Sequence, residues 1–229
     1  MSGSTDDNTE VFGAVIVAAG SGVRMEGQDK LFTRVGGRTL LGHAVAAFED
    51  CREISRIALV MNESNLERGR ELVNQEGFQK VIDVCSGGER RQDSVSCGLE
   101  SLGRVDWVAV HDGGRPLIRP GMIARGLNAA RETGASVPVI PLVDTIKNVA
   151  PDGVVSGTLD RSRLVAAQTP QVFRYDLLMR AHTEITHDVT DDSAMVELLG
   201  VAVMTYEGRR RNIKITTPDD LWLAESYLQ

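Results

Sequence analysis

Short, almost continuous apolar runs alternate along this chain with longer segments whose apolar residues recur every three or four positions. The runs predict β-strands that are covered on both faces, and the recurrence predicts amphipathic helices. The predicted strands are 14–18, 56–61, 80–84, 107–111 and 135–140, and the helices between them are 39–50, 64–75, 91–102 and 120–133. This alternation predicts an α/β, Rossmann-like fold with a mainly parallel central sheet flanked by helices.

The pattern changes near residue 141. From there to Phe173, apolar and polar residues alternate around the turn sequence PDG, which predicts an inserted β-hairpin or arm. Later elements are predicted at 175–185 and 191–200 (helices), 201–207 (strand) and from Thr217 as N-cap and Pro218 onward (helix). We expect a disordered tail over 1–11, a single domain over 12–229 and an arm at about 141–168.

Composition narrows the function classes. The chain has 229 residues and a net charge of −7, which argues against general binding of nucleic acids or anionic membranes. The three cysteines lack the spacing of a disulfide framework or a zinc site, and no apolar run approaches the roughly 20 residues of a membrane span. The N-terminus also lacks the features of a signal peptide, so we expect a cytoplasmic protein.

Three turns at the carboxyl ends of predicted strands are candidates for a ligand site, because open α/β sheets bind ligands there. The first, AAGSGVRM at 18–25, departs from the dinucleotide fingerprint at Met25 and from the P-loop at Gln28. What remains is a glycine-rich turn that carries two cations, Arg24 and Lys30. The backbone amides of such a turn can bind phosphate oxygens. A structural glycine turn with solvated charges is the alternative.

The second turn, SGGERRQDS at 86–94, opens a helix and carries Glu89, Arg91 and Ser94 near its N-terminus, although a simple helix cap would look alike. The third, VHDGGRP at 110–116, places Asp112 and Arg115 where a cation and a phosphate could bind. Mutual pairing of these two side chains is the alternative. We expect His111 to be a packed, hydrogen-bonded histidine.

Together the segments AAGSGVRM…DK, GGERRQDS, VHDGGRP, DTIK, DRSRL…QTPQ, TDDSAMVE and NIKITTPDDL resemble, in content and order, the 2-C-methyl-D-erythritol 4-phosphate cytidylyltransferases. The resemblance runs from about Gly13 to the C-terminus. It implies the nucleotide-diphospho-sugar transferase type of fold and a Mg²⁺-requiring enzyme of non-mevalonate isoprenoid biosynthesis. That enzyme joins CTP and 2-C-methyl-D-erythritol 4-phosphate into 4-diphosphocytidyl-2-C-methyl-D-erythritol and pyrophosphate. It also implies a homodimer whose β-arms complete each other's active sites.

The resemblance assigns roles position by position. Arg24 and Lys30 resemble the pair that stabilises the transition state, and Arg161 and Lys214 resemble the pair that aims the acceptor phosphate. The residues that resemble the CTP site are Ala18, Ala19, Gly20, Gly88, Glu89, Ser94 and Gly113. The residues that resemble the acceptor site are Asp112, which is also the metal-side carboxylate, Arg115, Thr145, Arg161, Thr169, Thr190 and Lys214. Thr145 and Arg161 lie on the arm and would act across the dimer.

Three positions depart from the family pattern. Asp29 stands before Lys30 where proline is usual, HDGGRP replaces HDAARP, and the first motif begins VAAG where PAAG is commoner. None of the departures removes a charged catalytic group. An acid beside Lys30 could, however, weaken its attraction for phosphate.

The implied chemistry is in-line attack by the acceptor phosphate on the α-phosphorus of CTP. It needs charge stabilisation and positioning, and no general base, because the nucleophile is already ionised. The alternatives are a ribitol-5-phosphate cytidylyltransferase, a glycosyltransferase or sugar nucleotidyltransferase of the same broad fold, and a non-catalytic nucleotide-binding protein. The pattern around Arg161 favours methylerythritol phosphate over ribitol phosphate.

Overall fold

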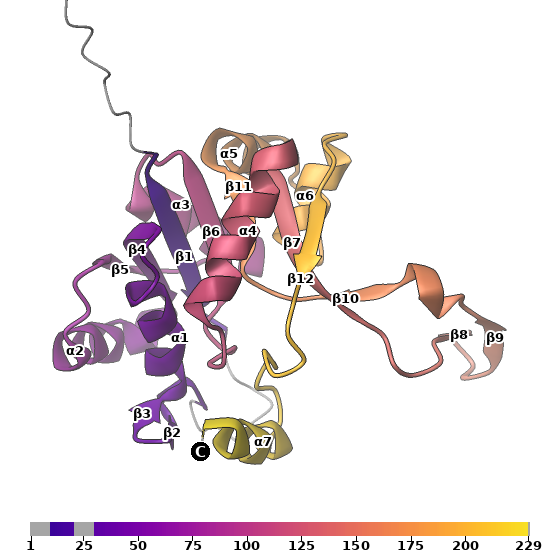
Figure 1. Ribbon diagram of the computed structural model, residues 1–229, viewed down its shortest axis with the longest axis horizontal. Helices are drawn as coiled ribbons and strands as arrows, with labels where there is room; N and C mark the ends of the chain where they lie inside the picture. The colour runs from indigo at the N-terminus through magenta and orange to yellow at the C-terminus, as the bar shows by residue number, and fades with distance from the viewer. Residues whose placement is uncertain (1–9, 21–29, 229) are drawn as a thin grey trace, which may run out of the picture.

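A computed structural model describes residues 10–20 and 30–228. Its central sheet follows the strand order β10-β7-β11-β6-β1-β4-β5, and β12 pairs with β7 beside this path (Figure 1). The strands are β1 Phe12–Ala18, β4 Ile54–Met61, β5 Val81–Ser86, β6 Trp107–Asp112, β7 Ala135–Pro141, β10 Val165–Ala167, β11 Gln171–Arg174 and β12 Met204–Glu207. β1 runs parallel to β4 and β6, and β4 runs parallel to β5, so the predicted mainly parallel sheet is confirmed.

Helices cover both faces of the sheet. The helices are α1 Leu40–Glu49, α2 Leu66–Glu76, α3 Arg91–Leu102, α4 Pro120–Thr133, α5 Tyr175–Glu184, α6 Asp192–Leu198 and α7 Pro218–Leu228. One face of β1 packs through Ala14 and Ile16 into the core that includes α1, α2 and α4. The opposite face packs through Val15 into the core that includes α3, α5 and α6. Every predicted helix is present, and the helices on these two faces bury the apolar stripe that the sequence shows.

The alternating segment read from the sequence as a hairpin or arm reaches Phe173, past the expected arm bounds of about 141–168. Its last residues, from Gln171, belong to β11, which runs antiparallel between β6 and β7. Val172 and Phe173 are fully buried there. Residues 10 and 11 are the described part of the segment expected to be a tail, and the Val11 amide donates to Asp106 Oδ2 at 2.7 Å. Residues 10 and 11 are thus held against the body.

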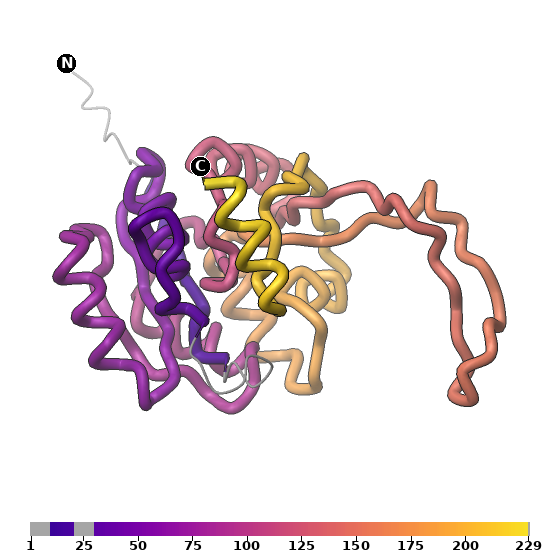
Figure 2. The backbone as a smooth tube through the Cα atoms, turned by 90° about the horizontal axis from the view of Figure 1, so that it is seen from below, coloured from indigo at the N-terminus to yellow at the C-terminus, as the bar shows by residue number. Residues whose placement is uncertain are grey.

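The segment between β7 and β10 leaves the body as an extended arm (Figure 2). Its tip is an antiparallel hairpin of β8 Lys147–Val149 and β9 Val155–Thr158, followed by the 3₁₀ turn Arg161–Arg163. The turn between the strands uses Gly153 at φ +84°, which favours glycine. Val149, Val154 and Val155 are more than half exposed.

The remaining short elements surround the carboxyl end of the sheet. They are the 3₁₀ turns Lys30–Phe32 and Glu63–Asn65 and the strand pair β2 Arg34–Val35 and β3 Arg38–Thr39. Helix α7 packs Ala224 against Val35 and Leu40 beneath this end of the sheet (Figure 1). No helix among residues 10–20 and 30–228 is long and apolar enough to cross a membrane.

Candidate active site

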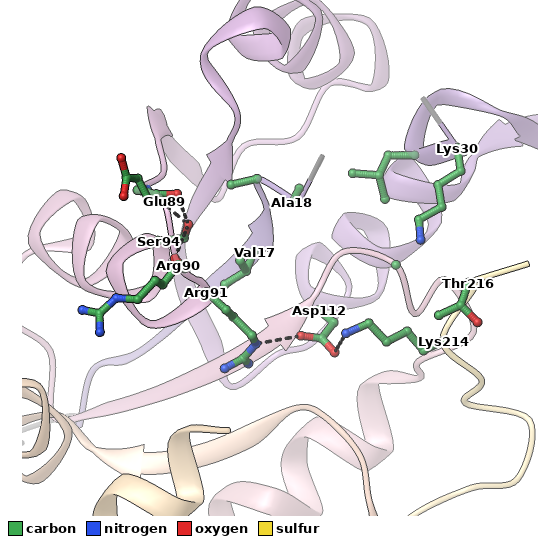
Figure 3. A pocket seen from close by; sticks show the side chains of 15 residues that line it. Val17, Ala18, Lys30, Glu89, Arg90, Arg91, Ser94, Asp112, Lys214 and Thr216 are labelled. Carbon is green, nitrogen blue, oxygen red and sulfur yellow. Dashed lines mark hydrogen bonds and ion pairs between the residues drawn. The ribbon is translucent and has the colours of Figure 1, made fainter. Parts of the chain in front are cut away.

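A cavity of about 420 Å³ lies at the carboxyl ends of β1 and β6, beside the turn that follows β5 (Figure 3). It is where the strand-end argument placed a ligand site. The predicted site residues that line it are Ala18, Ala19, Gly20, Lys30, Gly88, Glu89, Ser94, Asp112 and Lys214. The sequence prediction did not assign a role to the further lining residues Val17, Leu31, Arg90, Arg91, Gly114 and Thr216.

One wall of the cavity is a glycine turn held tightly by helix α3. The Gly88 amide donates to Ser94 Oγ at 3.2 Å, and Ser94 Oγ donates to the Arg90 carbonyl at 3.1 Å. A Cβ on Gly88 would lie 2.5 Å from Asp93 Cβ, and one on Gly87 would lie 2.6 Å from Ala19 Cβ. Glycine is therefore required at both positions, and it brings the turns after β1 and β5 into direct contact.

Asp112 sits at the floor of the cavity among three cations. Its Oδ2 lies 3.0 Å from Lys214 Nζ and 3.6 Å from Arg115 Nε, and its Oδ1 lies 3.3 Å from Arg91 Nε. Burial acts to raise the pKa of Asp112, but Arg91, Lys214 and Arg115 outweigh it and hold that pKa well below its usual range. The carboxylate is thus ionised at neutral pH. The pairing of Asp112 with Arg115 considered from sequence is part of this larger cluster.

Behind Asp112, a buried hydrogen-bond network fixes the end of β6. Thr169 Oγ1 accepts from the Asp112 amide at 3.1 Å and lies 3.0 Å from His111 Nδ1. His111 Nε2 lies 3.2 Å from the Arg115 carbonyl, which can only accept, so Nε2 carries the proton and Nδ1 accepts from Thr169. Burial lowers the pKa of His111 to about 4. His111 is fully buried, which confirms the prediction of a packed, hydrogen-bonded histidine.

Arg91 enters the cavity from the N-terminus of α3 and joins two acids. Its Nε faces Asp112, and its Nη1 donates to Asp192 Oδ2 at 2.8 Å. Asp192 is fully buried at the start of α6. Burial opposes the charge on Arg91, but Asp192 and Asp112 together raise its pKa. Sequence reasoning placed Arg91 only at a helix N-terminus and did not single out Asp192; the adjacent acids in TDDSAMVE were the available signal.

Two lysines face Asp112 and the glycine turn from the other side of the cavity (Figure 3). Lys30 Nζ donates to the Ile215 carbonyl at 2.6 Å, which ties the start of its segment to the loop that carries Lys214. The Lys214 side chain is 46% exposed. Together with Arg91, the lysines give the cavity a positive wall that can bind phosphate groups, in a protein whose net charge is −7.

Other predicted residues lie outside the lining of this cavity. Gly113, Arg115 and Thr169 are directly behind it, where Arg115 Nη1 donates to the Asn212 carbonyl at 2.9 Å. Thr145, Arg161 and Thr190 are exposed. Thr145 and Arg161 are on the arm, and Arg161 donates through Nη1 to the Val143 carbonyl of the arm itself. Arg24 and Asp29 lie outside the described residues.

The described side chains contain no group of three or more His, Cys, Asp or Glu residues that could hold a metal ion. Asp112 is the carboxylate at the floor of the cavity, and Glu89 is on its wall. Any metal here would have to take most of its ligands from a bound substrate, as Mg²⁺ does with nucleotide phosphates. Cys51, Cys85 and Cys97 are free thiols.

Comparisons of the sequence and of the fold with known proteins agree on one enzyme family. Residues 12–229 match the family model IspD, described as 2-C-methyl-D-erythritol 4-phosphate cytidylyltransferase. A protein of that name from Dehalococcoides mccartyi is 49% identical over 220 residues, covering 96% of this chain and 97% of the relative. One from Bacillus licheniformis is 42% identical and covers 94% of each. The structure of 4-diphosphocytidyl-2C-methyl-D-erythritol synthase from Anaerococcus prevotii superimposes with a TM-score of 0.85 at 29% identity, covering 97% of this chain and 100% of that one.

Proposed function

The chain belongs to the 2-C-methyl-D-erythritol 4-phosphate cytidylyltransferase family, and from this premise we propose the reaction and the roles of its residues. The enzyme transfers the cytidylyl group of CTP to 2-C-methyl-D-erythritol 4-phosphate. The products are 4-diphosphocytidyl-2-C-methyl-D-erythritol and pyrophosphate, in non-mevalonate isoprenoid precursor biosynthesis. The observation that carries the proposal is the cavity itself, where Lys30, Lys214 and Asp112 meet a glycine turn at the strand ends.

The reaction is an in-line displacement. An oxygen of the acceptor phosphate forms a bond to the α-phosphorus of CTP, and the bond from that phosphorus to the bridging oxygen of the β-phosphate breaks. The electron pair leaves with pyrophosphate, so no proton has to be removed from the nucleophile. The barrier is electrostatic, because a phosphate dianion approaches a triphosphate.

Cations placed in advance lower this barrier. Lys30, with Arg24, is proposed to stabilise charge on the α-phosphate and the leaving group. Lys214 is proposed to orient the acceptor phosphate together with Arg161. The Lys214 ammonium is 3.0 Å from Asp112, so its position is set before substrate arrives. The backbone of the turns at 18–20 and 88–89 is proposed to hold the nucleotide, as glycine-rich turns hold phosphate elsewhere.

Magnesium is proposed to enter with CTP. Asp112 fits such an ion, because it is ionised and one carboxylate combined with triphosphate oxygens is a donor set that Mg²⁺ accepts. Lys214 is the most exposed of the three cations around Asp112, so this side of the carboxylate faces the open cavity. When bound, the ion would neutralise charge on the triphosphate.

The arm is proposed to act in a homodimer. The arm that carries these two predicted residues, Thr145 and Arg161, extends away from the body of its own chain (Figure 2), so we propose that they contact the acceptor in the cavity of a second copy. The exposed valines at the arm's tip supply apolar surface for that contact.

The decisive experiment is a coupled assay of pyrophosphate release, with CTP and Mg²⁺ and either methylerythritol phosphate or ribitol 5-phosphate as acceptor. Release with methylerythritol phosphate and a far smaller kcat/KM with ribitol 5-phosphate is expected. The reverse preference would assign the alternative acceptor. CTP binding without release of pyrophosphate from either acceptor would refute the catalytic proposal.

A further inference from the structure

Asp192 is a buried acid to which the proposed reaction assigns no role. It begins helix α6, and its carboxylate is fully enclosed. Oδ2 accepts from Arg91 Nη1 at 2.8 Å. Oδ1 has no hydrogen-bond partner among the described residues, and the facing His182 Nε2, 4.0 Å away, has none either. A buried carboxylate that leaves one oxygen unbonded is costly, so its retention calls for a reason beyond stability.

The backbone around Asp192 is held from two directions. Asp191 caps α6 by accepting from the Ala194 amide at 2.9 Å. The Ser193 amide donates to Gln171 Oε1 at 2.9 Å, which links α6 to strand β11 of the central sheet. The backbone that carries Asp192 is therefore held in place, and its carboxylate is enclosed within the protein.

Arg91 connects the buried Asp192 carboxylate to the cavity. Its guanidinium is planar, so the contact of Nη1 with Asp192 determines the direction in which Nε faces Asp112, 3.3 Å away. Lysine could not bridge two acids in this way. The neighbouring Arg90 is turned outward to Asp93 and Asp188, and it does not substitute for Arg91.

We propose that Asp192 is a positioning residue for nucleotide transfer, which through Arg91 holds the Asp112 carboxylate in the orientation that the nucleotide site uses. Arg91 is the link, and it presents its remaining N–H groups to the bound anion. This inference rests on the proposed function for its kinetic consequence. The restraint itself is a property of the three side chains.

The test is Asp192→Asn, which keeps the side-chain shape and an acceptor for Arg91 but removes the charge. Arg91 keeps Asp112 as a partner and is 30% exposed, so no charge is stranded. We expect Tm to stay within about 3 °C of the parent protein. We expect kcat/KM for CTP to fall about 10- to 100-fold, the usual effect of losing a group that orients a metal ligand.

Arg91→Lys is the second variant, since it retains the charge but loses the planar bridge, and it should show the same kinetic pattern. Glu76→Gln is the matched control. It removes a carboxylate from the 2.8 Å ion pair with Arg38, which is not part of the cavity lining, and it should leave kcat/KM unaltered.

A second readout separates this inference from the proposed function. The Arg91 Nε–H resonance, assigned by its loss in Arg91→Lys, should exchange slowly with solvent in the parent protein and rapidly in Asp192→Asn. This NMR measurement tests the restraint on Arg91 even if the parent protein transfers the cytidylyl group to neither acceptor. Such a lack of transfer would refute only the proposed function. An unchanged resonance, or a loss of activity that merely follows a lowered Tm, would overturn the positioning role.

Discussion

Acidification should weaken the fold through His111, the imidazole that holds the end of β6. The folded protein keeps this ring neutral, because burial lowers its pKa to about 4 from an ordinary value of 6.5. Between these values the unfolded chain binds a proton that the folded chain does not. Stability is therefore fully present above pH 6.5 and is lost as the pH falls toward 4.

The size of the effect follows from the two pKa values. Once the pH lies below both values, the lowered pKa of His111 has reduced the free energy of unfolding by about 3.4 kcal/mol in total. Between pH 7 and pH 5 the linkage relation gives a loss of about 2 kcal/mol. With a urea m-value of about 3 kcal/mol/M, the unfolding midpoint should fall by about 0.7 M. Asp112 adds almost nothing in this interval, because its ordinary pKa of 3.8 and its lowered pKa in the folded protein both lie below pH 5.

Urea unfolding followed by circular dichroism at pH 7, 6 and 5 measures this change. His111→Phe is the comparison variant, because it keeps a ring against Phe48, whose centroid lies 5.1 Å from that of His111, but cannot titrate. Its stability at pH 7 will be lower, and its pH dependence should be flatter. The remaining slope comes in part from His182, whose pKa burial also lowers. An identical slope in both proteins, or an imidazole NMR titration of His111 near 6.5, would refute the reasoning.

Three further predictions concern catalysis, assembly and packing. Lys30→Ala should lower kcat by about 10²- to 10³-fold in the pyrophosphate assay with a smaller change in CTP binding, and near-normal kcat would refute its transition-state role. Arg161→Ala should raise KM for the acceptor, while its affinity for CTP, measured by calorimetry, is preserved. If the arms act across a dimer, mixing the Arg161→Ala and Lys30→Ala proteins should restore activity, and no recovery would contradict that arrangement. Gly98→Ala should lower the free energy of unfolding, measured in urea, by about 1–3 kcal/mol, because its Cβ would lie 2.4 Å from Val15 Cγ1. Unchanged stability would show that strand β1 can shift to make room for the methyl group.

The sequence predicted the position of the site because local apolar runs identify the strands and where each of them ends. Continuous apolar residues in β1, β4 and β6 identified buried parallel strands. Once those ends are known, the turns that follow them must meet at one edge of the sheet. The glycine turn at 87–88 and Asp112 could therefore be placed together before any coordinates.

Other features depended on tertiary contacts. Strand β11 is only four residues long, and nothing local reveals that it fills the space between β6 and β7. Arg90 and Arg91 are adjacent, chemically alike and both line the cavity, and only their positions at the start of α3 decide that Arg91 reaches Asp112 and Asp192. The burial of Asp192 depends on how α6 packs, and a single chain does not contain the surface that Thr145 and Arg161 are proposed to meet.

The chain passes through the sheet in an order that places strands from its C-terminal part between and beside strands from its N-terminal part. A cut in the exposed turn at 150–154 would leave β1 and β4–β7 on one polypeptide and β10, β11 and β12 on the other. Strand β11 pairs with both β6 and β7, and β10 and β12 both pair with β7, so neither piece closes a core alone. Joined, they unite Lys30 and Asp112 from one with Lys214 from the other. Made separately, with each piece fused to one of two binding partners, the pieces are expected to act as a split enzyme that releases pyrophosphate when the partners bind each other.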